Sequence, residues 1–294
     1  MDSAVASGDK RYRDLLAITK REASAFGANY ETFVREACRT DLLDAADLCL
    51  PLQVSADADA VDVLISSAEG GKFSTADLAP SLSAQLCAQY LCASSVTVER
   101  LIHVKRRLVY FNESDALYCI SLLILLDCGE ELHAFCKYLD FVRGNRLLGE
   151  DGGESADFMK FAFYLRDCVG SGQIERMPSF KKAYKGVSAL WRDGREATIY
   201  AVLDERLALV HNLVRKQGER PSAFALAPVE LLALIKLMNS SAPETQHIIV
   251  PSHVSIPSIF VDGAPSGRKW PDEVSRFIES VKGDQSGFIA ALPV

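Results

Sequence analysis

Residues 114–126 read Ser-Asp-Ala-Leu-Tyr-Cys-Ile-Ser-Leu-Leu-Ile-Leu-Leu, and Ala116 to Leu126 is the longest apolar run in the chain. A helix that spans a membrane needs about 20 apolar residues, so this run is too short to cross a bilayer. Ser114 and Asp115 are residue types that cap helices, and Gly129 follows as a helix breaker. We therefore expect a buried helix at the centre of the protein.

Apolar residues at helical spacing continue on both sides of this run. They predict helices over residues 10–38, 42–50, 75–93, 96–112, 130–142, 155–168, 178–187, 196–216, 229–238 and 272–281. Pro51 is expected to end the second of these helices, and Pro178 to begin a later one. The pattern of residues 55–80 is ambiguous before the helix that begins near Thr75 is established.

The chain changes character after Asn239. Residues 248–251 and 254–261 are short, β-branched and punctuated by proline, which favours an extended or β segment over 245–265. No long alternation of strands and helices occurs, so a parallel sheet is not expected. The fold prediction is mainly α, a multi-helix bundle or an α-solenoid-like array. It has an acidic helical region at 1–112 and a C-terminal helical domain at 113–294.

The charge of the chain is uneven. All of the net charge of −7 lies within residues 1–150, and residues 151–294 are neutral. An acidic protein repels a phosphate backbone, which disfavours nucleic acid as a partner and favours a basic protein. Hydrophobic residues make up 49% of the chain and charged residues 24%, which is typical of globular proteins.

The chain has eight cysteines, with no C-x-x-C pair among them. Most lie in apolar runs, as in Cys87 and Cys92, so we interpret them as free thiols in the core, consistent with a reducing compartment. Residues 1–10 are polar and lack the apolar segment of a secretory signal. We therefore expect a cytoplasmic protein that does not engage a membrane.

The strong templates for catalysis are absent from the sequence. It has no H-E-x-x-H, no EF-hand loop, no G-x-G-x-x-G or G-x-x-x-x-G-K-[ST] phosphate loop, and no G-x-S-x-G elbow. We expect no catalytic residue, no metal and no cofactor.

Arg206 and His211 form the one weak catalytic candidate. Their R-x-x-x-x-H spacing resembles the signature of HEPN ribonucleases, helical proteins in which paired subunits use Arg to stabilise phosphate charge and His to move protons. A chain with this many arginines and histidines is expected to contain about one such pair by chance. A helical ribonuclease is therefore the alternative function.

Acidic residues are concentrated between residues 41 and 77, with Lys72 as the single basic residue. A solvated face is the default interpretation. Because apolar residues lie between the charges, this stretch is also a candidate for binding a basic partner. The candidate partner-binding residues are Asp41, Asp44, Asp47, Asp57, Asp59, Asp62, Glu69 and Asp77.

Three stretches resemble PoNi-type immunity proteins, which are helical antidotes to polymorphic nuclease toxins. They are residues 114–139, Pro178 to Lys185 with the long helix that follows, and Phe224 to Leu237, where Glu230 matches a Glu of the family. The resemblance covers about residues 110–251. It departs where Ala225 and Leu226 replace the Tyr-Trp pair of the family, and Val250-Pro251 only partly matches its terminal segment.

This resemblance implies a stoichiometric inhibitor without turnover. It would bind a cognate, basic toxin, a nuclease delivered by a bacterial secretion system, and occlude it. A helical scaffold or secreted effector is a further alternative, and a homodimer is possible.

Overall fold

The computed structural model describes residues 8–22, 32, 45–95, 113–144, 154–174, 177–188, 196–216, 222–257, 260, 272, 274–276 and 278–279. This part of the chain is mainly α-helical and contains no strand, which confirms the predicted fold class. A first helical segment covers residues 8–22. The elements that follow are α2 (Ala45–Ala68), η1 (Thr75–Leu78), α3 (Ala79–Ser95), α5 (Glu113–Leu125), α6 (Gly129–Gly144), α7 (Glu154–Ser171), α9 (Glu196–Lys216), α10 (Ala223–Leu226), α11 (Val229–Ser240) and η2 (Glu244–Gln246).

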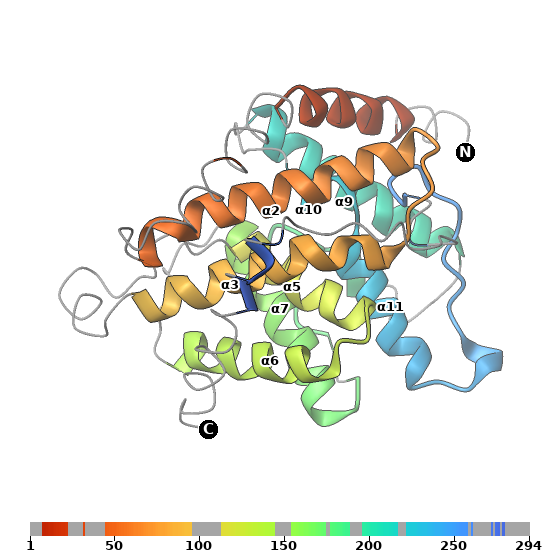
Figure 1. Ribbon diagram of the computed structural model, residues 1–294. Coiled ribbons are helices and arrows are strands. Elements are labelled where there is room, and N and C mark those ends of the chain that lie inside the picture. Colours follow the sequence, from red (N-terminus) through yellow and green to blue (C-terminus); the bar gives the residue numbers. More distant parts are fainter. Residues whose placement is uncertain are drawn as a thin grey trace.

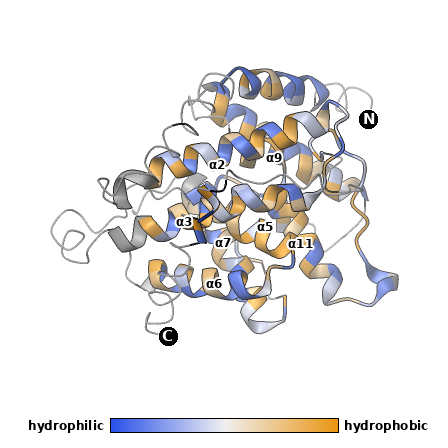
Figure 2. Cartoon of the chain, viewed as in Figure 1, coloured by the Kyte–Doolittle hydropathy of each residue, from blue (hydrophilic) through white to orange (hydrophobic). Residues whose placement is uncertain are grey.

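Helix α5 lies at the centre of the fold (Figure 1). Every residue from Ala116 to Ile124 is buried, as the apolar run predicts. The helix packs against α3, α6, α7, α10 and α11, and after its polar first turn it is mainly hydrophobic in Figure 2. Several of these neighbours are distant in sequence, whereas in a solenoid each unit contacts only the next. The described helices therefore form a bundle around α5.

Helices α2 and α3 form an antiparallel pair beside α5 (Figure 1). Gly70 in the connecting turn has a φ of 92°, a conformation that glycine adopts without strain. A side chain at Gly71 would meet the backbone oxygen of Ser66. The carboxylate of Asp77 accepts the backbone N–H of Ser74 at 2.8 Å, which caps the start of η1.

Pro51 does not end a helix, contrary to the prediction. It lies inside α2, which continues to Ala68 through the ambiguous stretch. Proline within a helix removes a hydrogen bond and costs about 3 kcal/mol. The long contact between α2 and α3, in which Leu52, Val63 and Leu64 are buried, offsets this cost.

The helix predicted from Pro178 is also wrong: residues 177–184 are not helical. The carboxylate of Asp157 in α7 accepts the backbone N–H groups of Lys181, Lys182 and Ala183 at 2.6–3.2 Å. Tyr184 then adopts a positive φ of 57°. These bonds take donors that a helix would use and hold the segment as an irregular loop.

The other predicted helices agree with the structure where it describes them. Helix α9 has the predicted bounds, and α6, α7 and α11 each begin at or next to the predicted residue. Residues 96–112 lie outside the described residues. Residues 247–257 are non-helical, and the described residues of the last predicted helix, 272, 274–276 and 278–279, are helical.

One buried hydrophobic cluster contains residues from both predicted domains, for example Leu52 and Leu117. The boundary at residue 112 lies outside the described residues and stays a prediction. Cys49, Cys87, Cys119 and Cys168 are buried free thiols, as predicted. No described helix combines the length and the hydropathy that crossing a membrane requires.

The first helical segment packs on α9, far along the chain. Tyr12 and Leu15 are buried, and Asp14 forms ion pairs of 2.6 Å with both His211 and Arg215. Hydrogen bonds from Arg215 and then His211 hold the pKa of Asp14 below its usual value.

Candidate functional site

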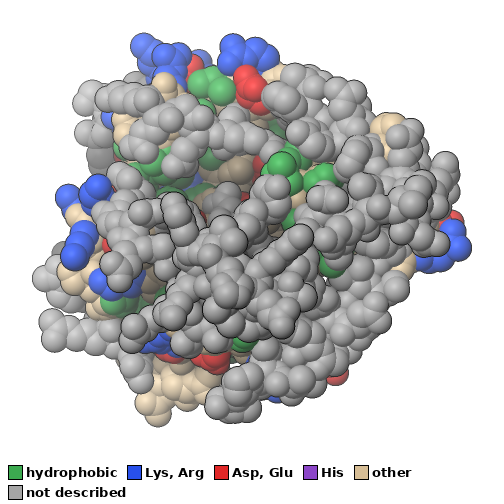
Figure 3. Space-filling model, turned by 90° about the vertical axis from the view of Figure 1, so that its left-hand side faces the viewer, with side chains coloured by type: hydrophobic (Ala, Val, Ile, Leu, Met, Phe, Trp, Pro, Cys, Tyr) green, Lys and Arg blue, Asp and Glu red, His purple; other side chains and the backbone are tan. Residues whose placement is uncertain are grey.

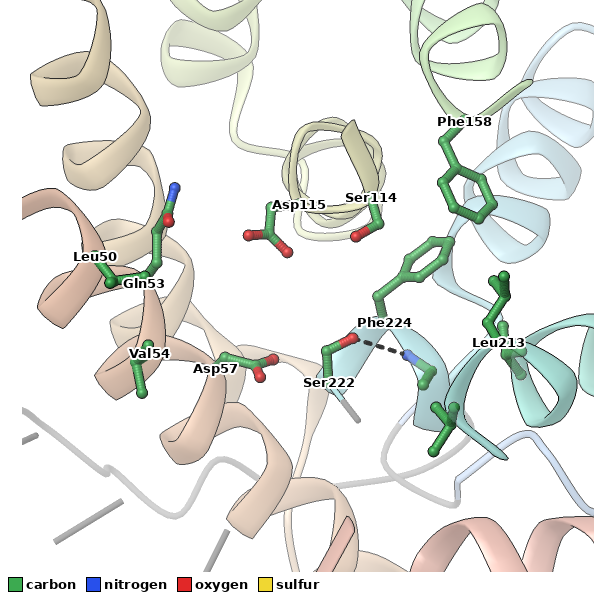
Figure 4. A pocket seen from close by; sticks show the side chains of 13 residues that line it. Leu50, Gln53, Val54, Asp57, Ser114, Asp115, Phe158, Leu213, Ser222 and Phe224 are labelled. Carbon is green, nitrogen blue, oxygen red and sulfur yellow. Dashed lines mark hydrogen bonds between the residues drawn. The ribbon is translucent and has the colours of Figure 1, made fainter. Parts of the chain in front are cut away.

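A pocket with a volume of about 360 Å³ opens between α2, α5, α9 and α10, with Phe158 of α7 at one end (Figure 4). Its polar residues are Gln53, Asp57, Ser114, Asp115 and Ser222. Its apolar residues are Leu50, Val54, Phe158, Val210, Leu213, Val214, Phe224 and Ala225. We call this the acidic pocket.

Asp57 and Asp115 reach the acidic pocket from different helices. In Figure 4 both carboxylates, together with Ser222, surround the same space, and Phe158 and Phe224 stand on one side of it. Asp57 also accepts the backbone N–H of Ala223 at 2.7 Å, which connects α2 to the start of α10. Asp115 lies in the first turn of α5, where the helix dipole favours a negative charge.

A small chamber of about 10 Å³ adjoins the acidic pocket and shares Asp57, Asp115 and Phe224 with it. Tyr118 and Gln85 line this chamber. Both side chains are buried, and the Tyr118 hydroxyl and Gln85 Oε1 have no hydrogen-bonding partner among the described residues. Such groups are uncommon in folded proteins.

Burial raises the pKa of Tyr118 well above its usual value, and the negative charges of Asp57, Asp59 and Asp115 add to the effect. The phenol is therefore protonated at neutral pH and is available as a hydrogen-bond donor and acceptor.

Leu50 lies at the rim of the acidic pocket and is 43% exposed, which is unusual for a large apolar side chain in the described part of the chain. The N-terminal end of α2 lies on the left of Figure 1, and Figure 3 shows the molecule from that side. Hydrophobic and acidic side chains show together in a hollowed area in the upper half of that face.

The structure separates the acidic residues that the sequence grouped together. Asp41 and Asp44 lie outside the described residues, and only the backbone of Asp47 is described. Asp77 is buried as a cap, Asp62 is exposed, and Glu69 forms an exposed ion pair with Lys20.

Asp57 and Asp59 are half-buried, and of the eight candidates Asp57 is the one among the described lining residues of the acidic pocket. Asp115 joins it there, although the sequence indicated a helix cap. Its position three residues before Tyr118 places both on one helix face, a signal that was available in the sequence.

Arg206 is not a surface residue that could meet a phosphate. It is buried, and its guanidinium donates to Glu230 at 2.8 Å, to the carbonyls of Ala225 and Ala227 at 3.0 and 2.9 Å, and to that of Phe224. His211 pairs instead with Asp14. The two residues of the ribonuclease signature thus have separate structural partners, which weighs against that alternative.

Tyr184 completes the cluster around Arg206 by donating its hydroxyl to Glu230 at 3.0 Å. We call Arg206, Glu230 and Tyr184 the matched cluster, because its buried positive and negative charges face each other. Burial, followed by the charge of Glu230, raises the pKa of Tyr184 well above its usual value.

Ser255, His253 and Asp204 have the residue types of a hydrolase triad. His253 Nδ1 lies 2.7 Å from Ser255 Oγ, and its Nε2 lies 3.5 Å from Asp204. However, the backbone N–H of Ser255 also donates to His253 Nδ1, and Ser255 is only 1% exposed. A substrate has no access to this hydroxyl, and the bonds close a local turn.

No cluster of three or more His, Cys, Asp or Glu side chains suited to a metal ion occurs in the described residues. No family model, curated protein or solved structure matches this chain. The resemblance to PoNi-type immunity proteins therefore stays a prediction.

Proposed function

We propose that this chain is a protein-binding inhibitor that neutralises a basic toxin by stoichiometric occlusion, and that the toxin docks over the acidic pocket. The observation that supports this proposal is the pocket itself. It combines two carboxylates, Asp57 and Asp115, with an aromatic end wall and the exposed Leu50 at its rim.

Each part of the acidic pocket matches a known component of protein interfaces. Charges of one sign raise the rate of encounter with a partner of opposite sign. Apolar side chains that enter a pocket then supply most of the binding energy. The net charge of −7 favours a basic partner throughout the approach.

The resemblance to immunity proteins makes the partner a secreted nuclease toxin. A nuclease surface is basic where it meets phosphate, so an acidic protein that covers that surface blocks the substrate. The inhibitor needs no catalytic group of its own for this function.

The test begins with the gene immediately upstream of that of this chain, which we expect to encode the toxin. We expect co-expression to restore growth of cells that produce the toxin, and the two proteins to elute as an equimolar complex in size-exclusion chromatography. Growth inhibition that persists in the presence of this chain, with no complex, would overturn the proposal.

Two matched variants locate the interface. Leu50→Glu places a like charge at the rim of the acidic pocket and is expected to raise the Kd for the toxin at least ~10-fold, which corresponds to about 1.4 kcal/mol. Ile249→Glu makes the same change at a residue that is 82% exposed and is absent from the described lining of the pocket, so it is the control. Equal effects of both variants would exclude the pocket as the docking site.

A further inference from the structure

We infer that the small chamber beside the acidic pocket holds one ordered water molecule, which bridges Tyr118 of α5 and Gln85 of α3. This water is a ligand of the folded chain, because fixed polar groups bind it and the packing of α2, α3 and α5 encloses it. The inference concerns the interior of the fold, so it does not depend on the proposed function.

The first argument is the size of the chamber. The centre of a water molecule has a space of about 10 Å³ there, at the lower end of the roughly 10–15 Å³ that a buried water requires. Ala56 of α2 and Ser81 of α3 leave this space open, because their side chains are short. The chamber is too small for an amino-acid side chain or an organic ligand, so its occupant is a single small molecule or ion.

The second argument is a pair of polar groups that line the chamber. The Tyr118 hydroxyl and Gln85 Oε1 belong to residues that are only 5% and 4% exposed, and neither atom has a hydrogen-bonding partner among the described residues. Buried polar groups are nearly always hydrogen-bonded to protein or to ordered water. Because both groups border the same small space and do not bond to each other, one water between them supplies the missing partner of each.

The third argument is that the hydrogen bonds of this water can be balanced. A buried water typically makes about three hydrogen bonds. It donates one proton to Gln85 Oε1 and accepts from the protonated hydroxyl of Tyr118. Its second proton can go to Asp57 or Asp115, which also line the chamber. A carboxylate accepts several hydrogen bonds, so the bond that Asp57 already accepts from the backbone N–H of Ala223 does not exclude this one.

A high-resolution crystal structure of the intact chain tests the inference. We expect an isolated density peak in the chamber at about 2.5–3.2 Å from both Tyr118 Oη and the terminal amide of Gln85, which are the distances of hydrogen bonds. An empty chamber, or a direct hydrogen bond between the two side chains, would overturn the inference. A peak with several contacts of about 2.0–2.6 Å to oxygen atoms would also overturn it, because those are the distances of a bound metal cation.

Two matched variants assign the water to its partner. Tyr118→Phe removes only the hydroxyl, and we expect the density peak to be lost. Tyr138→Phe is the control, because Tyr138 is also buried but its hydroxyl donates to the carbonyl of Gln89 at 3.2 Å, outside the described lining of the chamber. The peak should remain in this variant. A peak that remains in Tyr118→Phe, or that is lost equally in both variants, contradicts the bridge to Tyr118.

Magnetic relaxation dispersion with oxygen-17 water repeats the test in solution and needs no crystals. It detects waters that stay inside a protein for longer than the molecule takes to rotate. We expect the signal of one such water to be lost in Tyr118→Phe and kept in Tyr138→Phe, and identical signals in the two variants and the unmodified chain would overturn the inference. The free energy of unfolding is not the readout, because release of the ordered water offsets the hydrogen bonds that are lost with it.

Discussion

The matched cluster and the acidic pocket both contain carboxylates near a buried tyrosine, but the hydrogen-bonding partners of the two tyrosines differ. In the matched cluster, Glu230 receives hydrogen bonds from Arg206 and Tyr184. Beside the acidic pocket, the described carboxylates of Asp57, Asp59 and Asp115 act on Tyr118, and its hydroxyl has no hydrogen-bonding partner among the described residues. Removing one partner from the matched cluster leaves a buried charge or hydrogen-bonding group uncompensated, whereas the Tyr118 hydroxyl has no described hydrogen bond to lose.

The largest effect is expected when the matched cluster is broken. Glu230→Ala leaves the buried guanidinium of Arg206 without its carboxylate, and removing one partner of a buried pair costs about 3–5 kcal/mol. Urea denaturation measures this loss. Glu69→Ala, which removes the partner of exposed Lys20, is the control and should cost about 0–1 kcal/mol. A similar, small loss in the free energy of unfolding in both variants would contradict a stabilising role for the matched cluster.

A second prediction tests whether hydrogen bonds from backbone N–H groups stabilise a buried carboxylate as the Arg206 guanidinium does in the matched cluster. Asp157→Ala removes the acceptor for the N–H groups of Lys181, Lys182 and Ala183. We expect a loss of about 2–3 kcal/mol, because these are hydrogen bonds to a charged group. Amide hydrogen exchange at residues 181–183 should become faster while that of α5 stays slow; unchanged exchange would contradict this role.

The third prediction sharpens the comparison by making one substitution in each region. Tyr184→Phe removes a hydrogen bond to Glu230 and should lower the free energy of unfolding by about 1–2 kcal/mol. Tyr118→Phe removes a buried hydroxyl without a described partner, and we expect no loss or a gain of up to about 1 kcal/mol. Thermal and urea unfolding of the two variants check the sign, and a loss in both would contradict it.

The smallest effect concerns pH. His253 faces Asp204 of α9, Asp9 of the first helical segment and the ring of Tyr200, and burial lowers its pKa below the usual 6.5 despite the two carboxylates. Between the lowered pKa and 6.5 the unfolded chain binds more protons, so stability falls as pH decreases below about 6.5.

Denaturation at pH 7 and pH 5 measures this dependence. His253→Gln should reduce the difference between the two pH values, whereas His247→Gln, at an exposed position, should not. A pH dependence that is identical in the three proteins would assign the effect to other groups.

The sequence predicts correctly those helices in which apolar residues recur at helical spacing. Helix α9 has buried Ile199, Leu203, Leu207 and Val210 at helical spacing, and its bounds agree with the prediction. The continuation of α2 beyond Pro51 was missed because Pro51 and the alternation of Ala and Asp over residues 56–60 obscure the helical pattern locally. The loop after Pro178 depends on Asp157, more than twenty residues earlier, so no local pattern indicates it.

The candidate site was only partly visible in the sequence. Asp57 was found because a local excess of negative charge shows in composition. Ser222 and Phe224 were not found, because they reach the same space as Asp57 only through the packing of α10 on α2, more than 160 residues along the chain. Arg206 was selected by a short motif, but its burial depends on the carbonyls around α10, which the motif does not contain.

The docking of the first helical segment on α9 has a consequence for synthesis of the protein. Asp14 and its partner His211 are separated by 197 positions. At about 5–20 residues per second, a ribosome needs roughly 10–40 s to add the residues between them. During that interval the apolar face of the segment, with Tyr12 and Leu15, lacks the surface of α9 that covers it, so this segment can reach its final place only after a much later part of the chain has been made.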